Sequence, residues 1–228
     1  MGSEMCIRDR ILYGSILAFT QTNSRLILGY SSIAQLGFIT LGLFAADNAA
    51  AGAQGALMQS IQHGLVVAPM LLVIVLLAER SAGSEDIRDM GGIAFRAPVL
   101  AGLFLVATLA TLAMPGSANF AGEFLILLGT FNDRQVFAFI ASIGVVLAAV
   151  YALRLYIRSM HNRTGPAVTS FEMSLRDGLV LVPLVLAIVA FALKPQVALD
   201  DAETAVKRVV APVLQAGGAE RAATEVRP

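Results

Sequence analysis

One apolar stretch decides the fold of this chain: APVLAGLFLVATLATLAMPGSANFAGEFLILLGTF, residues 97–131. Its 35 residues include a single ionisable side chain, Glu123. A charged carboxylate at mid-bilayer costs about 2.5–3.5 kcal/mol on insertion scales. The 15 Leu, Ile, Val and Phe residues of the stretch, at about 0.3–0.6 kcal/mol each, offset that cost. The stretch can therefore insert with its glutamate, which marks Glu123 as a candidate functional site. The alternative is a protonated glutamate hydrogen-bonded in a helix interface.

The same stretch is too long for one straight crossing. At about 1.5 Å per residue it would approach 50 Å, whereas the hydrocarbon core is about 30 Å thick. Proline and glycine interrupt it near the middle, so we predict one crossing made of two half-helices, 97–113 and 119–131. A tight hairpin of two short spans is the alternative. Broken helices mark binding sites near the midplane of transporters, and the candidate break residues are Pro115, Gly116, Ser117 and Asn119.

Composition assigns the whole chain to the membrane. Of 228 residues, 57% are hydrophobic and 14% charged, with a mean hydropathy of +0.76, against a usual charged share of about 25%. We predict an all-α polytopic membrane protein with about six transmembrane helices, one of them broken. The predicted elements are 11–22, 27–46, 54–78, 97–131, 136–159 and 178–193.

The net charge and the cysteine content limit the kinds of partner and metal site that the chain can have. A net charge of zero favours no nucleic-acid partner, and the single cysteine, Cys6, supports neither a disulfide framework nor a cysteine-ligated metal site. The two histidines, His63 and His161, are too far apart in sequence to form a local ligand motif. We therefore predict no metal site.

The two ends of the chain differ from its middle. Residues 1–10, MGSEMCIRDR, carry four charges and resemble translated sequencing-adaptor text, so we set them aside from the fold; a signal peptide is the alternative. Residues 11–194 form the predicted transmembrane domain, which we expect to be truncated at Ile11. Residues 195–228 are predicted to form an amphipathic helix on the outer surface or on a partner, followed by a disordered tail from Ala216.

Loop charges predict the orientation. With one crossing for 97–131, eight arginines fall on one face and two basic residues on the other, which makes the first face cytoplasmic. The tail then begins on the outer, periplasmic side of a bacterial inner membrane. The cytoplasmic set is Arg25, Arg80, Arg88, Arg96, Arg154, Arg158, Arg163 and Arg176, and the outer set is Arg134 and Lys194.

Polar residues recur at one depth. Counting about 1.5 Å per residue, His63 and Glu123 lie roughly 14 and 12 Å from the outer helix ends, and Gln35 lies roughly 12 Å from the inner end of its own helix. Gln59 precedes His63 by one turn, and Gln62 is its neighbour. We predict a polar axis through the bundle formed by Gln35, Gln59 and Gln62, with His63 and Glu123 as proton-translocation sites. The alternatives are a satisfied interface histidine and plain interhelical hydrogen bonding by the glutamines.

Four segments in unbroken order carry a resemblance: RLILGYSSIAQLGF, QGALMQSIQHGL, a short charged loop ending in GG, and ATLAMPGSANFAGEFLILLGTF. They are similar to the antiporter-like subunit M of NADH:quinone oxidoreductase, respiratory complex I, and to its mitochondrial counterpart. The resemblance covers about residues 11–200 and implies the second, C-terminal part of a fourteen-helix antiporter-like fold. It is most specific between Leu109 and Thr130.

The resemblance implies a role for each polar residue. Glu123 matches the acid of the second broken helix, the terminal proton site of the outward half-channel, and His63 matches a histidine of the central axis. The family often has a second axial histidine where this chain has Gln35, which implies a water-bridged relay rather than a direct histidine pair. This chain reads RLILGY where the family reads RLIAY, so the start of that helix is expected to shift by one residue.

The function implied is proton translocation as a subunit of an enzyme, with no redox chemistry in this chain. NADH, FMN, iron–sulfur clusters and quinone would be bound by other subunits, and the partners would be sister antiporter-like subunits and the lipid bilayer. Two alternatives are a subunit of a multisubunit cation/proton antiporter or membrane-bound hydrogenase, and an inactive scaffold subunit. A carrier for small organic solutes is a further alternative, and it would need anchoring charges beyond Glu123.

Overall fold

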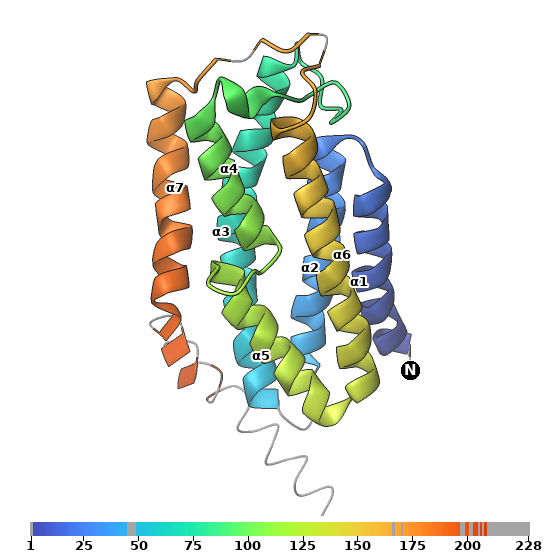
Figure 1. Cartoon of the computed structure of the whole chain (residues 1–228). Coiled ribbons are helices and arrows are strands. Elements are labelled where there is room, and N and C mark those ends of the chain that lie inside the picture. The colour runs from blue at the N-terminus through green and yellow to red at the C-terminus, as the bar shows by residue number, and fades with distance from the viewer. Residues whose placement is uncertain are drawn as a thin grey trace, which may run out of the picture.

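A computed structural model describes residues 2–44, 49–165, 167–169 and 171–196, together with 199–200, 203–204, 206 and 208. Its α-helices are α1 (Gly2–Thr20), α2 (Ser24–Leu43), α3 (Ala49–Arg80), α4 (Pro98–Thr111), α5 (Ala118–Asp133), α6 (Gln135–Met160) and α7 (Leu175–Leu193), with a short 3-10 helix, η1 (Ile93–Phe95). The helices stand side by side as a bundle whose connections lie at its two ends, except for the α4–α5 turn, which lies between them (Figure 1).

The bundle has the dimensions of a membrane domain. The helices α2, α3, α6 and α7 are long and apolar enough to cross a bilayer, and α4 and α5 are shorter apolar helices. These two short helices follow one another in the same direction between the ends of the bundle, so together they make one broken crossing rather than a hairpin (Figure 1). The predicted all-α polytopic membrane fold with one broken helix is confirmed.

The break follows from the local sequence. Pro98 occupies the first turn of α4, where a missing N–H costs nothing. Ala113 and Gly116 have φ angles of 49° and 89°, which no helix can accommodate. Ser117, with extended backbone, precedes the first residue of α5. The first half-helix ends at Thr111, two residues before the predicted 113, because Ala113 already has a positive φ angle. The second begins at Ala118, one residue before the predicted 119.

Helix α1 is longer than expected. It begins at Gly2 rather than at Ile11, so the residues that we set aside are helical. Ile7 and Ile11 are buried in one cluster with Phe38 of α2 and Ile126 of α5. This burial explains why the helix continues through the charged segment. The adaptor origin of residues 1–10 stays a prediction.

The predicted amphipathic helix and tail fall mainly outside the described residues. Of the segment 195–228, only eight positions are described, and everything from 209 onward is not.

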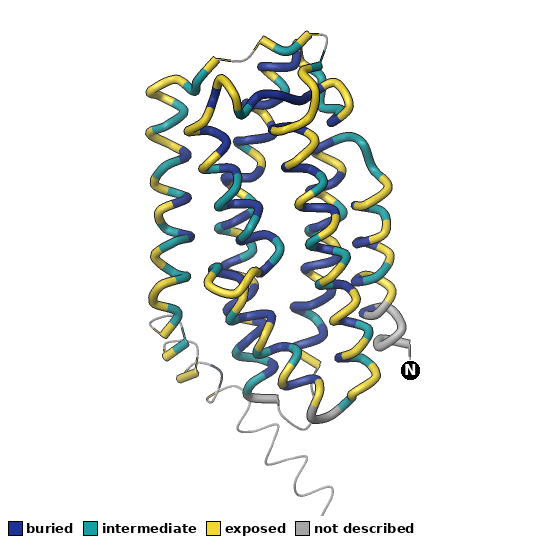
Figure 2. Tube along the Cα trace, in the orientation of Figure 1, coloured by how far each residue is buried: buried dark blue, intermediate teal, exposed yellow. Residues whose placement is uncertain are grey.

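Burial divides the bundle into a packed interior and an apolar outer surface. Figure 2 shows buried residues turned toward the neighbouring helices and exposed residues turned outward, with α7 the most exposed of the long helices. Phe104 and Tyr156 are in ring contact inside the core, with centroids 5.3 Å apart. Large apolar side chains such as Val136 and Phe139 are about 70% exposed, as expected of a surface that faces lipid.

Loops close one end of the bundle, the end predicted to be cytoplasmic. The Ile87 amide donates to the Thr22 carbonyl at 2.8 Å, which ties the α3–α4 connection to the α1–α2 turn. The Glu172 carboxylate accepts the amides of Val99 and Leu100 at 3.0 and 3.3 Å. A carboxylate at this position stabilises the N-terminus of α4, so the loop before α7 positions the first half of the broken helix.

Candidate functional site

Glu123 lies at the end of a chain of hydrogen bonds that joins three helices. It sits on α5 shortly after the break, with 4% of its surface exposed. Gln35 of α2 donates from Nε2 to Glu123 Oε1 at 2.8 Å. Gln59 of α3 donates from Nε2 to Gln35 Oε1 at 2.9 Å. Both glutamines are buried. The fold thus brings together three of the predicted site residues from segments far apart in the sequence.

Glycines set how closely α3 and α5 approach. A Cβ atom added at Gly122 would lie 2.7 Å from Gln59 Oε1, and one at Gly55 would lie 2.8 Å from the Ile126 amide nitrogen. Real Cβ atoms do not make such contacts. Only glycine leaves room for the opposing backbone here, so α3 and α5 lie in close contact at the turn of α3 that carries Gln59.

The break between α4 and α5 is a tight turn rather than an open loop. The Met114 amide donates to the Leu109 carbonyl at 3.2 Å, and the Ser117 amide donates to the Met114 carbonyl at 2.8 Å. Pro115, Gly116 and Ser117 lie in this turn. Asn119, which we expected in the break as well, lies instead in the first turn of α5. Its amide side chain is therefore held by a helix and is fully buried.

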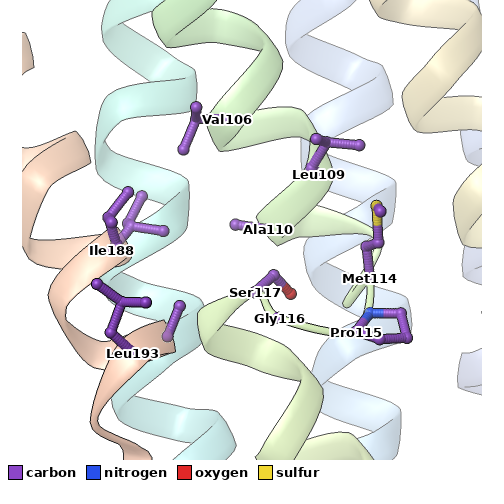
Figure 3. Close-up of a pocket in the computed structure, with 11 residues that line it drawn as sticks. Val106, Leu109, Ala110, Met114, Pro115, Gly116, Ser117, Ile188 and Leu193 are labelled. Carbon is purple, nitrogen blue, oxygen red and sulfur yellow. The ribbon is translucent and has the colours of Figure 1, made fainter.

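An apolar cavity adjoins the break. It has a volume of about 200 Å³ and lies between α4, the Met114–Ser117 turn and α7 (Figure 3). Among the described residues that line it, Ser117 is the only one with a polar side chain, and the Ile188 and Leu193 side chains of α7 face it across the cavity. The break is thus bordered by hydrocarbon on the α7 side, while its polar neighbours lie toward α2 and α3.

His63 is placed apart from the hydrogen-bonded chain. It is half-buried on α3, one turn after Gln59. Within the described part of the chain, no hydrogen bond joins His63 to Glu123 or Gln35. The predicted polar axis therefore divides into a connected part, Gln59–Gln35–Glu123, and two residues outside it, Gln62 and His63. The role of His63 as a proton site stays a prediction.

Several buried polar atoms near the Gln59–Gln35–Glu123 hydrogen bonds have no hydrogen-bond partner among the described residues. They are Gln59 Oε1, both amide atoms of Gln62, both amide atoms of Asn119, and Ser117 Oγ. Leaving a buried donor or acceptor unpaired costs about 1–3 kcal/mol. Native proteins keep few such groups, and those that persist call for a physical explanation.

A buried Ser31–Tyr151 pair was missed in the sequence. The hydroxyl groups of Ser31 on α2 and Tyr151 on α6 lie 2.8 Å apart, both fully buried. The available signal was spacing, because Ser31 precedes Gln35 by one helical turn and shares its face. This pair extends the polar interior from Glu123 toward α6.

The chemistry open to this site is proton binding. Glu123 is the only member of the hydrogen-bonded chain that titrates, because glutamine amides donate and accept hydrogen bonds without ionising near neutral pH. Burial disfavours a charged carboxylate, and a donated hydrogen bond favours it. Within the described residues, no group of three His, Cys, Asp or Glu side chains is arranged to hold a metal ion.

Comparison with known proteins gives a family and several relatives. The family described as NADH:quinone oxidoreductase/Mrp antiporter, transmembrane, matches residues 6–153. The NADH-quinone oxidoreductase subunit M of Rickettsia felis is 36% identical over 187 residues, which are 81% of this chain and 37% of that protein.

Solved structures agree on the fold. A chain of respiratory complex I from Thermus thermophilus superposes with a TM-score of 0.81 at 28% identity, over 90% of this chain and 43% of that chain. A chain of the Mrp complex from Dietzia sp. superposes equally well at 16% identity, over 90% of this chain and 46% of that chain. This chain spans well under half the length of the relatives that it matches.

Proposed function

Because the chain belongs to the NADH:quinone oxidoreductase/Mrp antiporter transmembrane family, we propose that it serves in the proton-translocating membrane arm of an NADH:quinone oxidoreductase. In this proposal it corresponds to part of subunit M and carries the outward half of a proton path. The enzyme activity belongs to the assembled complex. This chain moves protons and performs no redox step itself.

The observation that carries the proposal is the buried Glu123 and its hydrogen bond from Gln35. An intramembrane acid with one polar donor and no ion-pair partner among the described residues is costly to retain for structure alone. It lies on the second half of a broken helix, where freed backbone groups and polar side chains gather. These features together favour a residue that gains and releases a proton.

Each polar residue then has a task. Gln35 orients the Glu123 carboxylate, and Gln59 orients Gln35 through the second hydrogen bond. His63, one turn further along α3, is the proposed carrier on the inner side of the path, because an imidazole can bind and release a proton. Protons would leave Glu123 toward the outer face.

The energy for this movement comes from outside the chain. Moving one charge against 100 mV costs about 2.3 kcal/mol, which we assign to electron transfer in other subunits. NADH, FMN, iron–sulfur clusters and quinone are bound there in this proposal. The partners of this chain are sister antiporter-like subunits and the bilayer.

The proposed location is the inner membrane of a bacterium, with the segment after α7 on the periplasmic side. The bundle end that bears Arg88, Arg163 and Arg176 then faces the cytoplasm, in keeping with the positive-inside rule.

A subunit of a multisubunit cation/proton antiporter is the second candidate. The superposition on the Mrp complex chain favours it as far as the fold is concerned. Sequence identity favours subunit M instead, at 36% with the Rickettsia protein. The same fold serves both kinds of complex, so the partner subunits decide between them.

The deciding experiment is affinity purification of the tagged chain from the membranes of its own cells. We expect NADH:quinone reductase activity to copurify with it and to fall in proportion when the chain is depleted. Copurification with an antiporter complex that oxidises no NADH would contradict the proposal and support the second candidate.

A further inference from the structure

Two side-chain amides are buried in the interface between α3 and α5 without a protein partner. Gln62 is 1% exposed and Asn119 is fully buried. All four of their polar atoms are unpaired among the described residues. Gln59 Oε1, one turn away from Gln62 on α3, is unpaired as well. Five buried donor and acceptor atoms thus belong to neighbouring turns of the same two helices.

The register of the two helices places these amides opposite each other. The close glycine contacts pair Gly52 with Gly129, Gly55 with Ile126, and Gln59 with Gly122. Position numbers rise along α3 as they fall along α5, in steps of three and four residues that keep to one face of each helix. The next step of this antiparallel register pairs Gln62 with Asn119. The interface therefore changes from glycine to facing amides as it reaches the break.

We propose that water binds between Gln62 and Asn119 and that it responds to the protonation of Glu123 through the Gln59–Gln35 amide chain. Water suits the site because each amide offers a donor and an acceptor, and a buried water makes about three hydrogen bonds to such groups. Gln59 and Gln62 are three residues apart on α3 and therefore neighbours on its surface, which puts Gln59 Oε1 beside the proposed water site. The proposal rests on Glu123 gaining and losing a proton, as in the proposed function.

The hydrogen bonds that join Gln59, Gln35 and Glu123 can run in either of two directions, because each glutamine amide can turn over and exchange its donor and acceptor atoms. With Glu123 ionised, Gln35 donates to the carboxylate and Gln59 donates to Gln35, which leaves Gln59 Oε1 as an acceptor at the open end. When Glu123 binds a proton, the new O–H can donate to Gln35 once the Gln35 amide turns over. Gln35 then donates to Gln59, and the open end of the chain becomes the Nε2 donor. No covalent bond other than the O–H bond of Glu123 changes.

The bound water transmits the reversed hydrogen-bond direction from Gln59 to the residues next to the helix break. A water next to Gln59 donates to it in the first orientation and accepts from it in the second. Gln62 and Asn119 can satisfy either orientation, because each carries both kinds of atom. Asn119 lies in the first turn of α5, so the protonation state of Glu123 reaches the residue that begins the second half-helix.

Among the described residues, few titratable groups other than Glu123 lie near the Gln59–Gln35–Glu123 hydrogen bonds. From α6, the Tyr151 hydroxyl is paired with Ser31 of α2, one helical turn before Gln35. From α3, His63 is one turn beyond Gln59. The residues of α2 and α3 that contact the carboxylate chain, Gln35 and Gln59, do not titrate. Glu123 is therefore the group whose protonation reverses the amide chain.

The test is infrared difference spectroscopy of the intact complex that contains this chain, with the asparagine amides labelled with ¹³C. The chain has five asparagines, and the Asn119→Leu variant identifies the Asn119 band. We expect that band to shift between the pH values at which the Glu123 carboxyl band is present and absent. The shift should vanish in Glu123→Gln, which cannot titrate, and persist in Thr130→Val. Thr130 is a matched control, since its buried hydroxyl bonds the Ile126 carbonyl.

The Gln35→Met variant tests whether Glu123 affects Asn119 through the glutamine hydrogen bonds or only because the two residues are close together. In this variant the Glu123 carboxyl should still titrate, while the Asn119 band should stop responding. An Asn119 band that never shifts in the wild type, or that shifts equally in Gln35→Met, would overturn the inference. The outcome is independent of proton pumping, so a Glu123 that titrates without pumping would contradict the proposed function and leave this inference standing.

Discussion

Gly122 controls the contact on which the site depends. Its Cα faces Gln59 so closely that an added methyl group would meet both the Gln59 side chain and its backbone nitrogen, at 2.7 and 3.0 Å. Backbone atoms cannot move aside as a flexible side chain can. The separation of α3 and α5 at the turn that carries Gln59 therefore depends on this glycine, as it depends on Gly55 one turn earlier along α3.

Gly122→Ala should push α3 and α5 apart. Overpacking of this kind costs about 1–3 kcal/mol, and the Gln59–Gln35 bond should weaken with it. Gly64→Ala is the matched control on α3, because a Cβ at Gly64 meets nothing within 4 Å, and alanine gains about 0.5–1 kcal/mol over glycine in a helix. Thermal unfolding of the complex in detergent measures both. Equal midpoints for the two variants would contradict the glycine contact.

The loop between α3 and α4 depends on Asp86. Its carboxylate accepts hydrogen bonds from the Thr22 hydroxyl at 3.0 Å and from the Arg88 backbone amide at 2.9 Å, and it pairs with the Arg88 guanidinium at 2.7 Å. The hydrogen bond from the Arg88 side chain is the main cause that lowers the pKa of Asp86 from 3.8 to about 2. These contacts tie the loop to the turn between α1 and α2.

This pKa shift makes the loop sensitive to acid. The folded pKa lies below the unfolded value, so the stabilisation is complete above about pH 5 and is lost as the pH falls toward 2. Asp86→Asn should lower stability by about 1 kcal/mol at pH 6, a value reduced for solvent screening, and by much less near pH 2, where the folded carboxylate is partly protonated. Arg88→Gln should reproduce most of the loss. Unfolding midpoints between pH 2 and 7 test this, and a deficit for Asp86→Asn that is independent of pH would refute it.

The helices themselves were largely predictable, and their contacts were not. Pro115 and Gly116 placed the break, because no helix continues through that pair in an apolar stretch. The length of α1 was missed, since the burial of Ile7 against Phe38 depends on a neighbour that periodicity does not identify. Gln35 and Glu123 are 88 residues apart, so the sequence could place both at one depth but could not show that they touch. The count of residues along its helix placed His63 at the same depth, yet in the structure His63 lies outside the Gln59–Gln35–Glu123 hydrogen bonds.

We predict how the whole bundle is oriented in the membrane. The loop between α6 and α7 and the segment after α7 lie at opposite ends of the bundle (Figure 1). Both Arg163 and Lys194 are exposed at those ends. The charge bias places Arg163 inside and Lys194 outside.

Labelling with a membrane-impermeant maleimide tests this orientation. After replacement of the single native cysteine by Cys6→Ser, Arg163→Cys should react in inverted vesicles only, and Lys194→Cys in right-side-out cells only. The reverse pattern would invert the proposed proton path, and labelling of both positions from one side would contradict the crossing by α7, which separates them.

The account as a whole depends on Glu123 carrying the transported proton, and NADH-driven proton uptake by inverted vesicles measures this most directly. At matched complex content, Glu123→Gln should keep assembly, because the amide is nearly isosteric, but lower the proton-to-electron ratio and slow coupled NADH oxidation. Glu123→Asp should retain part of both, and the exposed Arg96→Gln should match the wild type. His63→Ala should do less harm than Glu123→Gln, since water can occupy the space of the imidazole. If Glu123→Gln pumps at the wild-type ratio and rate, Glu123 is a structural residue and the account is wrong.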